Sequence, residues 1–388
     1  MSVCTNIYQQ VFCLSIEVCA ASTQTGTASE LQTYLQTQLT NLLSNSDFTN
    51  GDSWELAWGP VVWQLPFSQV TDQVLAVAYN STQQYYVVAI GATNPRSAFN
   101  VFYEDLAAVP EYMVSLGTNS NGDSVGSVSA GNYTALNLLL TMESGGQTLS
   151  AWLDTQAKAN ANANLVFCGH SLGGGLAPLL AWSLYPNAAS GTSWQNVYTF
   201  PTAGPTTADG AFSTIFNNAY PVTSGDGYQV WNTNHYNTRD IVPNAWADNG
   251  QAPGLSEITC TVIDWPSDMY YTTVSFEVEV VALRDIAEGL AAGGGSNPYF
   301  PCNNNGLFTG ARQNGQIGDA GTLAKEIVWQ HTTAYLEEFG VTALFDTSAV
   351  QANIQPLLLP LVPGLKGDLA AVAAQAAAGA QATEAAPA

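Results

Sequence analysis

One short segment constrains the fold more than any other part of the chain. Residues 165–168 form a continuous apolar run, and the pentapeptide GHSLG at residues 169–173 follows at once, ahead of a helix start rich in small residues. A G-x-S-x-G pattern between a buried strand and a helix predicts a sharp, strained turn, because side chains in place of the glycines would collide with the neighbouring strand and helix. The turn lifts Ser171 out at the helix N-terminus, where backbone amides face a developing oxyanion. The segment therefore predicts an α/β fold with a nucleophilic serine.

Strands and helices alternate along the rest of the chain. A capping box of Thr27 and Glu30 begins a predicted helix at residues 28–44, where leucines recur on one helical face. A second long helix is predicted at residues 135–158. Apolar runs predict strands at residues 74–79, 85–90, 165–168, 197–200 and 229–231. This order predicts an α/β architecture with a mostly parallel central sheet and helices on both faces.

A serine hydroxyl is a weak nucleophile and needs a neighbouring base. The chain has three histidines, at His170, His235 and His331. His170 is adjacent to Ser171 and points away from it in such a turn, which favours a structural role. In α/β-hydrolases the serine is followed by an acid and then by a histidine well downstream. His331 satisfies this order and His235 fits it poorly, so His331 is the predicted base.

The acid of such a triad should follow a sheet strand between the serine and the histidine. Asp240 is favoured because it closes a strand-like run at residues 229–236 and precedes Ile-Val-Pro, which would turn the chain away. Its predicted task is to hold the imidazole in the correct tautomer and to stabilise its charged form. Asp209 and Asp226 are interpreted as solvated acids in turns.

The oxyanion that forms in acyl transfer needs amide donors. Leu172 directly follows the serine and supplies one predicted donor. The second usually comes from the loop after an early strand, and here the strand at residues 85–90 leads into Gly91-Ala92-Thr93. Thr93 offers both an amide and a hydroxyl, so Thr93 and Leu172 form the predicted oxyanion hole.

The charge balance excludes several classes of partner. The 388 residues contain 7 Lys and Arg against 30 Asp and Glu, a formal net charge of -23. Such a chain cannot neutralise phosphates, which argues against nucleic acid and against an anionic membrane surface. No run approaches the roughly 18 apolar residues of a transmembrane helix, and the N-terminus lacks the basic start of a signal peptide. We therefore predict a soluble protein, either secreted or cytoplasmic.

Sequons and cysteines leave the compartment open. Sequons begin at Asn80 and Asn132, which is compatible with secretion. The six cysteines include no CxxC pair and no grouping with histidines that suggests zinc, so no metal site is expected. Cys4, Cys13 and Cys19 lie close together in sequence, which permits a disulfide there but does not require one.

Six stretches of the chain occur in a recognisable order. They are residues 54–63; residues 86–95 with Glu104-Asp105; residues 169–180 (GHSLGGGLAPLL); Ala203-Gly204-Pro205 with Phe212; residues 237–246 (NTRDIVPNAW); and Gln330-His331 with Tyr335. Together they resemble the class 3 (fungal-type) lipase family of α/β-hydrolases over roughly residues 50–340. The resemblance implies Ser171 as nucleophile, Asp240 as acid and His331 as base, with Thr93 and Leu172 as the oxyanion hole.

The chain departs from the family pattern in two places. The usual Arg-Gly-Thr before the lid is Gly91-Ala92-Thr93 here, and Asn244 stands where close relatives often have a histidine. The threonine is retained, and His331 has no rival as the base. Neither departure removes a catalytic group.

The resemblance also implies a mobile helical lid, at residues 94–113. The alternative for this segment is a fixed helix that covers the core. The Gly- and Asn-rich region at residues 289–319 is expected to be a long loop or flap and is the rival lid. The predicted substrate-binding residues are Phe99, Phe102, Val242 and Trp246.

The predicted catalytic elements begin near Thr93 and close at His331, which leaves no room for an independent domain between them. We expect an N-terminal helical arm at residues 1–50 and an α/β-hydrolase catalytic domain at residues 51–345. The remaining residues, 346–388, form a C-terminal extension whose Ala-rich end is predicted to be disordered.

The expected reaction is ester hydrolysis through an acyl-enzyme on Ser171, without a metal or cofactor. The resemblance implies a triacylglycerol lipase that acts on a neutral lipid or ester at a lipid–water interface. The alternatives are a carboxylesterase or a feruloyl-type aryl esterase on soluble esters. The hypothesis from a different class is a non-catalytic binding protein with the hydrolase fold, and the intact Ser171, Asp240 and His331 argue against it.

Overall fold

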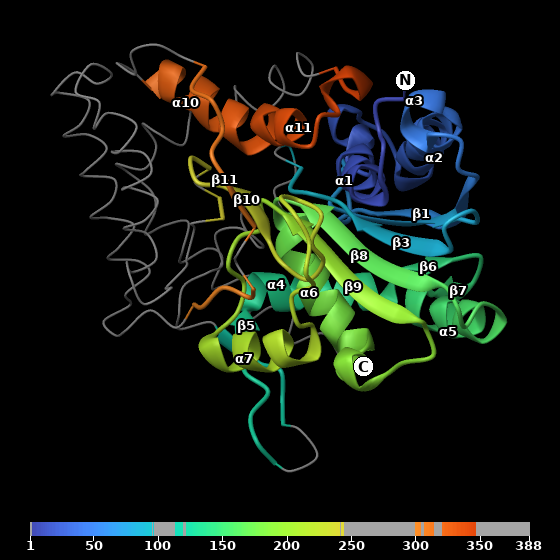
Figure 1. The fold of residues 1–388 in the computed structure, drawn as a ribbon, viewed down its shortest axis with the longest axis vertical. Coiled ribbons are helices and arrows are strands. Elements are labelled where there is room, and N and C mark those ends of the chain that lie inside the picture. The colour runs from blue at the N-terminus through green and yellow to red at the C-terminus, as the bar shows by residue number, and fades with distance from the viewer. Residues whose placement is uncertain are drawn as a thin grey trace, which may run out of the picture.

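A central sheet organises the molecule. The computed structural model describes residues 2–94, 96, 113–118, 122–240, 242–243, 299–303, 306–313 and 320–346. Within them, seven strands form one sheet in the order β1-β2-β3-β8-β9-β10-β11 (Figure 1). The strands are β1 (Trp54–Trp63), β2 (Gln73–Asn80), β3 (Tyr85–Ile90), β8 (Asn164–His170), β9 (Asn196–Thr202), β10 (His235–Asn237) and β11 (Gly306–Phe308). From β3 to β11 neighbouring strands are parallel, and β1 and β2 add antiparallel pairs at one edge, which confirms the predicted sheet.

Helices cover both faces of this sheet, as predicted (Figure 1). One face carries α4 (Ala130–Thr141), α5 (Leu149–Ala159), α6 (Leu172–Leu184) and α7 (Gly210–Ala219). The other face carries α1 (Ile7–Glu17), α2 (Ala28–Ser44) and α11 (Ala334–Glu338), with α3 (Ser46–Thr49) and α10 (Ala320–Val328) nearby in the chain. In the part of the chain that the structure describes, no helix is long and apolar enough to cross a membrane.

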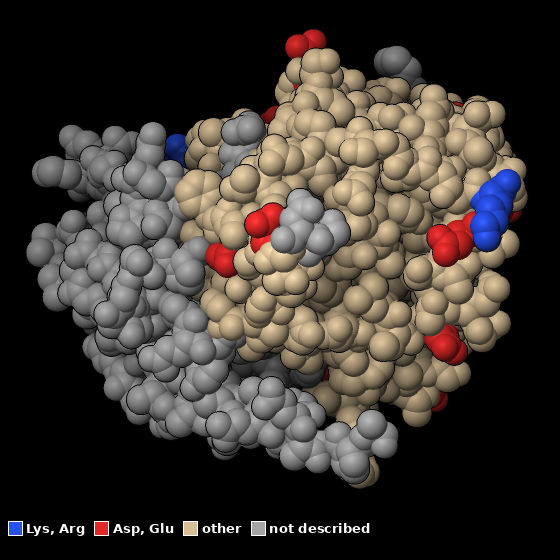
Figure 2. Space-filling model, turned by 90° about the horizontal axis from the view of Figure 1, so that it is seen from below, with Lys and Arg blue, Asp and Glu red and all other residues tan. Residues whose placement is uncertain are grey.

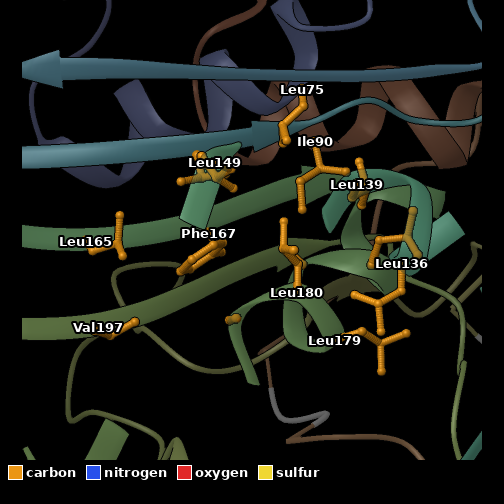
Figure 3. Packing of buried hydrophobic residues seen from close by; sticks show 14 of the residues in the cluster. Leu75, Ile90, Leu136, Leu139, Leu149, Leu165, Phe167, Leu179, Leu180 and Val197 are labelled. Atoms are coloured by element: carbon orange, nitrogen blue, oxygen red, sulfur yellow. The ribbon is translucent and has the colours of Figure 1, made fainter. Parts of the chain in front are cut away.

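Successive side chains of the central strands point to opposite faces, so each face has its own core. In β3, Val88 and Ile90 belong to the cluster under α4 and α6, whereas Val87 and Ala89 belong to the cluster under α1 and α2. Both faces are therefore buried, which explains why these strands are continuous apolar runs in the sequence. Figure 3 shows the first cluster, in which the strands contribute Leu75, Ile90, Leu165, Phe167 and Val197 and the helices contribute Leu136, Leu139, Leu149, Leu179 and Leu180.

The N-terminal segment is integrated into the second core. The helix α2 has the predicted bounds and the predicted capping box between Thr27 and Glu30. The helix α1, which the sequence analysis did not predict, buries Phe12 completely and stacks it on Phe339 with ring centroids 4.0 Å apart. Helix α1 packs against β8, the strand that ends at the serine turn. The domain boundary predicted at residue 50 stays a prediction.

Three predicted elements differ from the structure. The helix expected at residues 135–158 is two helices, α4 and α5, because Gly145 and Gly146 adopt positive φ in a hairpin between them. The strand expected at residues 229–231 is a loop, and the strand lies further on at β10. The long loop or flap expected at residues 289–319 is interrupted in its described part, because β11 is a strand of the central sheet and Tyr299 is fully buried.

Neither sequon asparagine is available to a glycan in this fold. The Asn80 side chain is fully buried and donates to Asp52 Oδ2 over 2.9 Å. Asn132 is buried in α4 and donates to Ser129 Oγ over 2.6 Å. The two sequons therefore give no support for secretion. The cysteines Cys4, Cys13, Cys19, Cys168 and Cys302 are free thiols, with Cys4 Sγ and Cys13 Sγ 3.7 Å apart.

Two of the three histidines are buried in the sheet. Burial lowers the pKa of His170, at the end of β8, to about 3, with the neighbouring His331 as a smaller cause. Burial also lowers the pKa of His235, on β10, to about 4. Glu17 shows the opposite effect, because burial raises the pKa of its carboxyl group to about 7. All three groups therefore favour their neutral forms in the folded protein.

These pKa shifts predict how stability depends on pH. Unfolding frees His170 and His235 to take up protons below about pH 6.5, so each lowers the free energy of unfolding as the pH falls from about 6.5 towards 4. Glu17 acts in the opposite direction between about pH 7 and 4.5. Replacing His235→Gln should therefore reduce the slope of unfolding free energy against pH by about 1.4 kcal/mol per pH unit in this window. Urea titrations at several pH values measure both slopes, and equal slopes would show that His235 is not held neutral.

Candidate active site

The serine turn has the strained geometry that its sequence predicts. Strand β8 ends at His170, Ser171 has φ 57° and ψ -128°, and α6 begins at Leu172. A Cβ atom on Gly169 would lie 2.3 Å from the carbonyl of Gly173, and one on Gly173 would lie 2.4 Å from Ile90 O. Glycine at both positions therefore lets the helix start close to two strands, which a side chain would prevent.

A chain of hydrogen bonds joins the serine to a buried acid. The distance from Ser171 Oγ to His331 Nε2 is 2.8 Å, and the distance from His331 Nδ1 to Asp240 Oδ2 is also 2.8 Å. The Asp240 side chain is fully buried, whereas the His331 side chain is 15% exposed. The structure thus brings together the three residues selected from the sequence, with the acid deep and the serine end accessible.

Two further donors hold the Asp240 carboxylate. Tyr335 donates its phenol proton to Oδ2 over 2.8 Å, and the Val242 amide donates to Oδ1 over 3.0 Å. Burial and the adjacent carboxylate raise the pKa of Tyr335 well above its usual value, so the phenol keeps its proton. Donors of this kind stabilise a buried carboxylate in its charged form. The sequence analysis quoted Tyr335 within the family resemblance but gave it no role.

The turn that carries His331 is fixed from β10. Residues Trp329–Thr333 form a π-helical turn between α10 and α11. At the end of β10, the Asn237 side-chain amide donates to Gln330 O over 3.0 Å and to Gln330 Oε1 over 2.6 Å, and its backbone N–H donates to Tyr335 Oη over 3.0 Å. The sequence analysis quoted Asn237 and Gln330 within the family resemblance but gave them no role, because their contacts are too distant in sequence for any local pattern to reveal.

The other two histidines have structural contacts. The Nε2 atom of His170 lies 2.7 Å from His331 O, and its Nδ1 atom lies 3.0 Å from Thr202 Oγ1. Because a carbonyl oxygen only accepts, we assign Nε2–H as the donor to it, so the imidazole supports the backbone of the His331 turn. His235 Nε2 lies 2.9 Å from Val230 O, and its ring packs against Phe200. Neither ring bonds to Ser171.

Asp209 and Asp226 have different surroundings. Asp226 is exposed in a turn, as expected. Asp209 is instead the N-cap of α7, where Oδ1 accepts from Phe212 N over 2.9 Å and Oδ2 accepts from Ser127 N over 2.8 Å. Its interpretation as a solvated turn acid is therefore wrong, because both carboxylate oxygens satisfy backbone donors.

The two predicted oxyanion donors lie at the same edge of the sheet as the serine. Leu172 is the first residue of α6, and Thr93 follows β3, whose last residue Ile90 is paired with Gly169. The close approach of Gly173 to Ile90 brings the N-terminus of α6 against the end of β3. Their role as an oxyanion hole stays a prediction.

The predicted substrate-binding residues are mostly outside the described residues. Phe99, Phe102 and Trp246 fall there, as does nearly all of the predicted lid at residues 94–113. Val242 is half-buried next to Asp240 and contributes a backbone contact. Over the described ranges, no three His, Cys, Asp or Glu side chains are grouped so that they could hold a metal ion.

Comparisons with solved structures give the same fold. A structure described as M37 lipase is 20% identical over 89% of this chain and 96% of its own, with a TM-score of 0.65. Two fungal lipases have TM-scores below 0.5, so the conclusion about the fold does not depend on them. They are a Rhizomucor miehei lipase propeptide complex (16% identity, 62% of this chain, 63% of that chain, TM-score 0.38) and a Rhizopus microsporus var. chinensis lipase (15%, 62%, 70%, 0.37). A comparison with curated protein sequences gives no significant match.

A sequence comparison matches part of the chain to one family. Residues 76–249 match the family described as Lipase (class 3), and this segment contains β3, the serine turn and Asp240. The mostly parallel sheet with helices on both faces is of the α/β-hydrolase type. Over this segment the chain is therefore similar to the class 3 lipase family, and its fold is that of a lipase-type hydrolase.

Proposed function

We propose that this protein hydrolyses carboxylic esters through an acyl-enzyme on Ser171. The observation that supports this most is the unbroken chain of hydrogen bonds from Ser171 Oγ through His331 to Asp240 Oδ2, with both links at 2.8 Å. The match of residues 76–249 to the class 3 lipase family supports a carboxylic ester hydrolase independently of that geometry. We propose Ser171 as the nucleophile, His331 as the base and Asp240 as the acid of this reaction.

In the first half-reaction, Ser171 Oγ attacks the ester carbonyl carbon while His331 Nε2 accepts the hydroxyl proton. The carbonyl π electrons move to the oxygen, and the amides of Thr93 and Leu172 stabilise the resulting oxyanion. When the tetrahedral intermediate collapses, the bond to the leaving oxygen breaks and His331 returns its proton to that oxygen. An alcohol leaves, and the acyl group stays on the serine.

In the second half-reaction, His331 accepts a proton from water as the water oxygen attacks the acyl carbon. The second intermediate collapses, the bond to Ser171 Oγ breaks, and the proton passes to the serine. A carboxylic acid is released. Asp240 favours both proton transfers because its carboxylate, held by Tyr335 and the Val242 amide, stabilises the imidazolium and keeps Nδ1 protonated.

The first-choice substrate is a triacylglycerol. Apolar residues stand next to the proposed nucleophile and acid in the sequence, where Leu172 follows Ser171 and Val242 lies two residues after Asp240, and such surroundings suit an acyl chain. On the described part of the face shown in Figure 2 charged side chains are sparse, and a surface of this kind suits a neutral lipid. The alternatives are a carboxylesterase or feruloyl-type esterase on soluble esters.

Removal of the nucleophile should abolish turnover. We expect Ser171→Ala to lower hydrolysis of p-nitrophenyl esters by roughly a millionfold without loss of folding, because no other group can form the acyl-enzyme. Initial rates and far-UV circular dichroism measure the two effects. Labelling of the parent protein by a fluorophosphonate separates the enzyme from a non-catalytic binding protein. Retained turnover in a folded Ser171→Ala variant would reject the assignment.

Removal of the negative charge of the proposed acid, Asp240, should strongly lower turnover. We expect Asp240→Asn to lower kcat by about 10⁴-fold, because an amide favours the wrong imidazole tautomer. Asp226→Asn is the matched control, since Asp226 is exposed in a turn, and it should retain full activity. A larger loss at Asp226 than at Asp240 would place the acid elsewhere.

A chain-length series distinguishes the substrate classes. A triacylglycerol lipase should hydrolyse long-chain triacylglycerols, and its rate should rise above the solubility limit of a short-chain ester, where droplets first form. A soluble-ester esterase should reach saturation below that limit. Titrimetric rates across the limit measure this difference, and feruloyl esters test the aryl esterase directly.

A further inference from the structure

The loop between β1 and β2 contains an exposed aromatic residue in an unfavourable backbone conformation. Ser68 N–H donates to Leu65 O over 2.9 Å, Pro66 is the second residue of the turn and Phe67, the third, has φ 71°. This is the pattern of a type II turn, in which the third position favours glycine or asparagine. The Phe67 side chain is fully exposed, with 103% relative accessibility.

The fold gains little from phenylalanine at this position. A positive φ is strained for a residue with a bulky side chain, and an exposed ring keeps its apolar surface in water. Strained backbone conformations of this kind cluster at functional sites and ligand contacts, where the strain serves the function. Phe67 is therefore a candidate contact residue.

The strand register places this turn at the edge of the sheet that carries the candidate active site. In β8, Gly169 pairs with Ile90 of β3; Ile90 pairs with Leu75 of β2; and Gln73 pairs with Trp63, the last residue of β1. The loop at residues 64–72 therefore leaves the sheet where the serine turn leaves it. The lateral offset is two to three strands, or about 10–14 Å.

Hydrogen bonds fix the loop in place. Asn94, which directly follows Thr93 and is buried, donates to Thr71 O and to Thr71 Oγ1 over 3.0 and 2.9 Å. Gln64 donates to Val70 O over 3.0 Å, and the Leu65 amide donates to Asp72 Oδ2 over 2.7 Å. The exposed turn is thus rigidly connected to the chain that supplies a predicted oxyanion donor.

The chemistry of the loop selects a neutral apolar partner. Residues 64–71 contain no charged residue, and the carboxylate of Asp72 at the end of the loop is buried. The whole chain has a net charge of -23, which disfavours an anionic lipid surface. A single aromatic buries about 150–250 Å², far below the roughly 800 Å² per partner of a stable protein interface. Binding to a lipid layer, by contrast, scales with the apolar area that inserts, so a single ring adds to it.

We propose that the Pro66-Phe67 turn inserts into the surface of neutral lipid droplets and holds the active-site edge of the sheet against them. This inference rests on the proposed function, because the bound lipid is the ester substrate. The contact is separate from the chemistry, since Phe67 belongs to none of the hydrogen bonds that connect Ser171, His331 and Asp240.

The test measures binding without turnover. In the Ser171→Ala background, the probe is triolein droplets coated with phosphatidylcholine, and flotation gives the bound fraction. Phe67→Asn should bind roughly 10- to 100-fold more weakly, the factor for one lost buried ring. Asparagine tolerates positive φ, so Phe67→Asn should unfold at the same or a higher temperature. Weaker binding then cannot come from misfolding.

Val222→Asn is the control, because Val222 is an exposed apolar residue at the opposite end of α6. It follows Tyr220, whose hydroxyl donates to Ala181 O and Tyr185 O at the C-terminal end of that helix. The helix begins at the serine turn, and its 13 residues span about 20 Å. Val222→Asn should bind droplets as the Ser171→Ala parent does.

The outcomes separate this inference from the proposed function. With Ser171 intact, Phe67→Asn should hydrolyse a soluble short-chain ester at the parent's kcat/KM. Unchanged droplet binding in Phe67→Asn, an equal loss in Val222→Asn, or an equal loss of soluble-ester activity would overturn the lipid contact. The lipid contact would also be overturned if the parent protein formed a dimer that Phe67→Asn dissociated while droplet binding stayed unchanged. Failure of the parent to hydrolyse any ester would instead reject the proposed function.

Discussion

The candidate site depends on how closely helix α6 approaches the sheet. Backbone atoms of the serine turn lie so near β3 and β9 that a Cβ on Gly173 would meet Ile90 O at 2.4 Å, and one on Gly174 would meet Thr202 O at 2.6 Å. This close packing forces the chain to reverse within one residue, which accounts for the positive φ of Ser171. The reversal presents the Ser171 hydroxyl to His331 and aims the first amides of α6 at the same space.

A buried carboxylate imposes the second constraint. Asp240 is almost completely buried, and an ionised carboxylate there would be unstable without donors. His331, Tyr335 and the Val242 amide supply them, and two of the three come from the segment around the π-helical turn. Asn237 ties that segment to β10. The polar network that supports the acid therefore also positions the base, so neither residue can move without the other.

The sequence predicted the elements whose determinants are local. The capping box fixed the start of α2, and apolar runs located β2, β3, β8 and β9 to within one or two residues of their ends. The predictions failed where structure depends on distant partners. Strand β11 lies in a Gly- and Asn-rich stretch of the sequence, which does not predict a strand, and it forms one because it pairs with β10. Strand β10 itself has three residues, too few for an apolar pattern.

The same distinction applies to the site. Ser171, Asp240 and His331 could be selected because a motif, a chain order and the scarcity of histidines limited the choice. Tyr335 and Asn237 could not be assigned roles, because their contacts join residues more than 90 positions apart. Such contacts follow from the assembled sheet and leave no periodic signal in the chain.

The N-terminal segment shows why position in the sequence is a poor guide to distance from the chemistry. Cys19 Sγ accepts a hydrogen bond from Ala92 N–H over 3.1 Å, beside the predicted oxyanion donor Thr93. Arg96 donates to Thr23 O over 3.0 Å, just beyond it. Both contacts come from the chain that follows α1, and α1 itself lies against β8. Through these two hydrogen bonds the N-terminal segment supports the loop after β3. Residues 1–50 therefore contribute to the geometry of the site, although they contain none of its proposed catalytic groups.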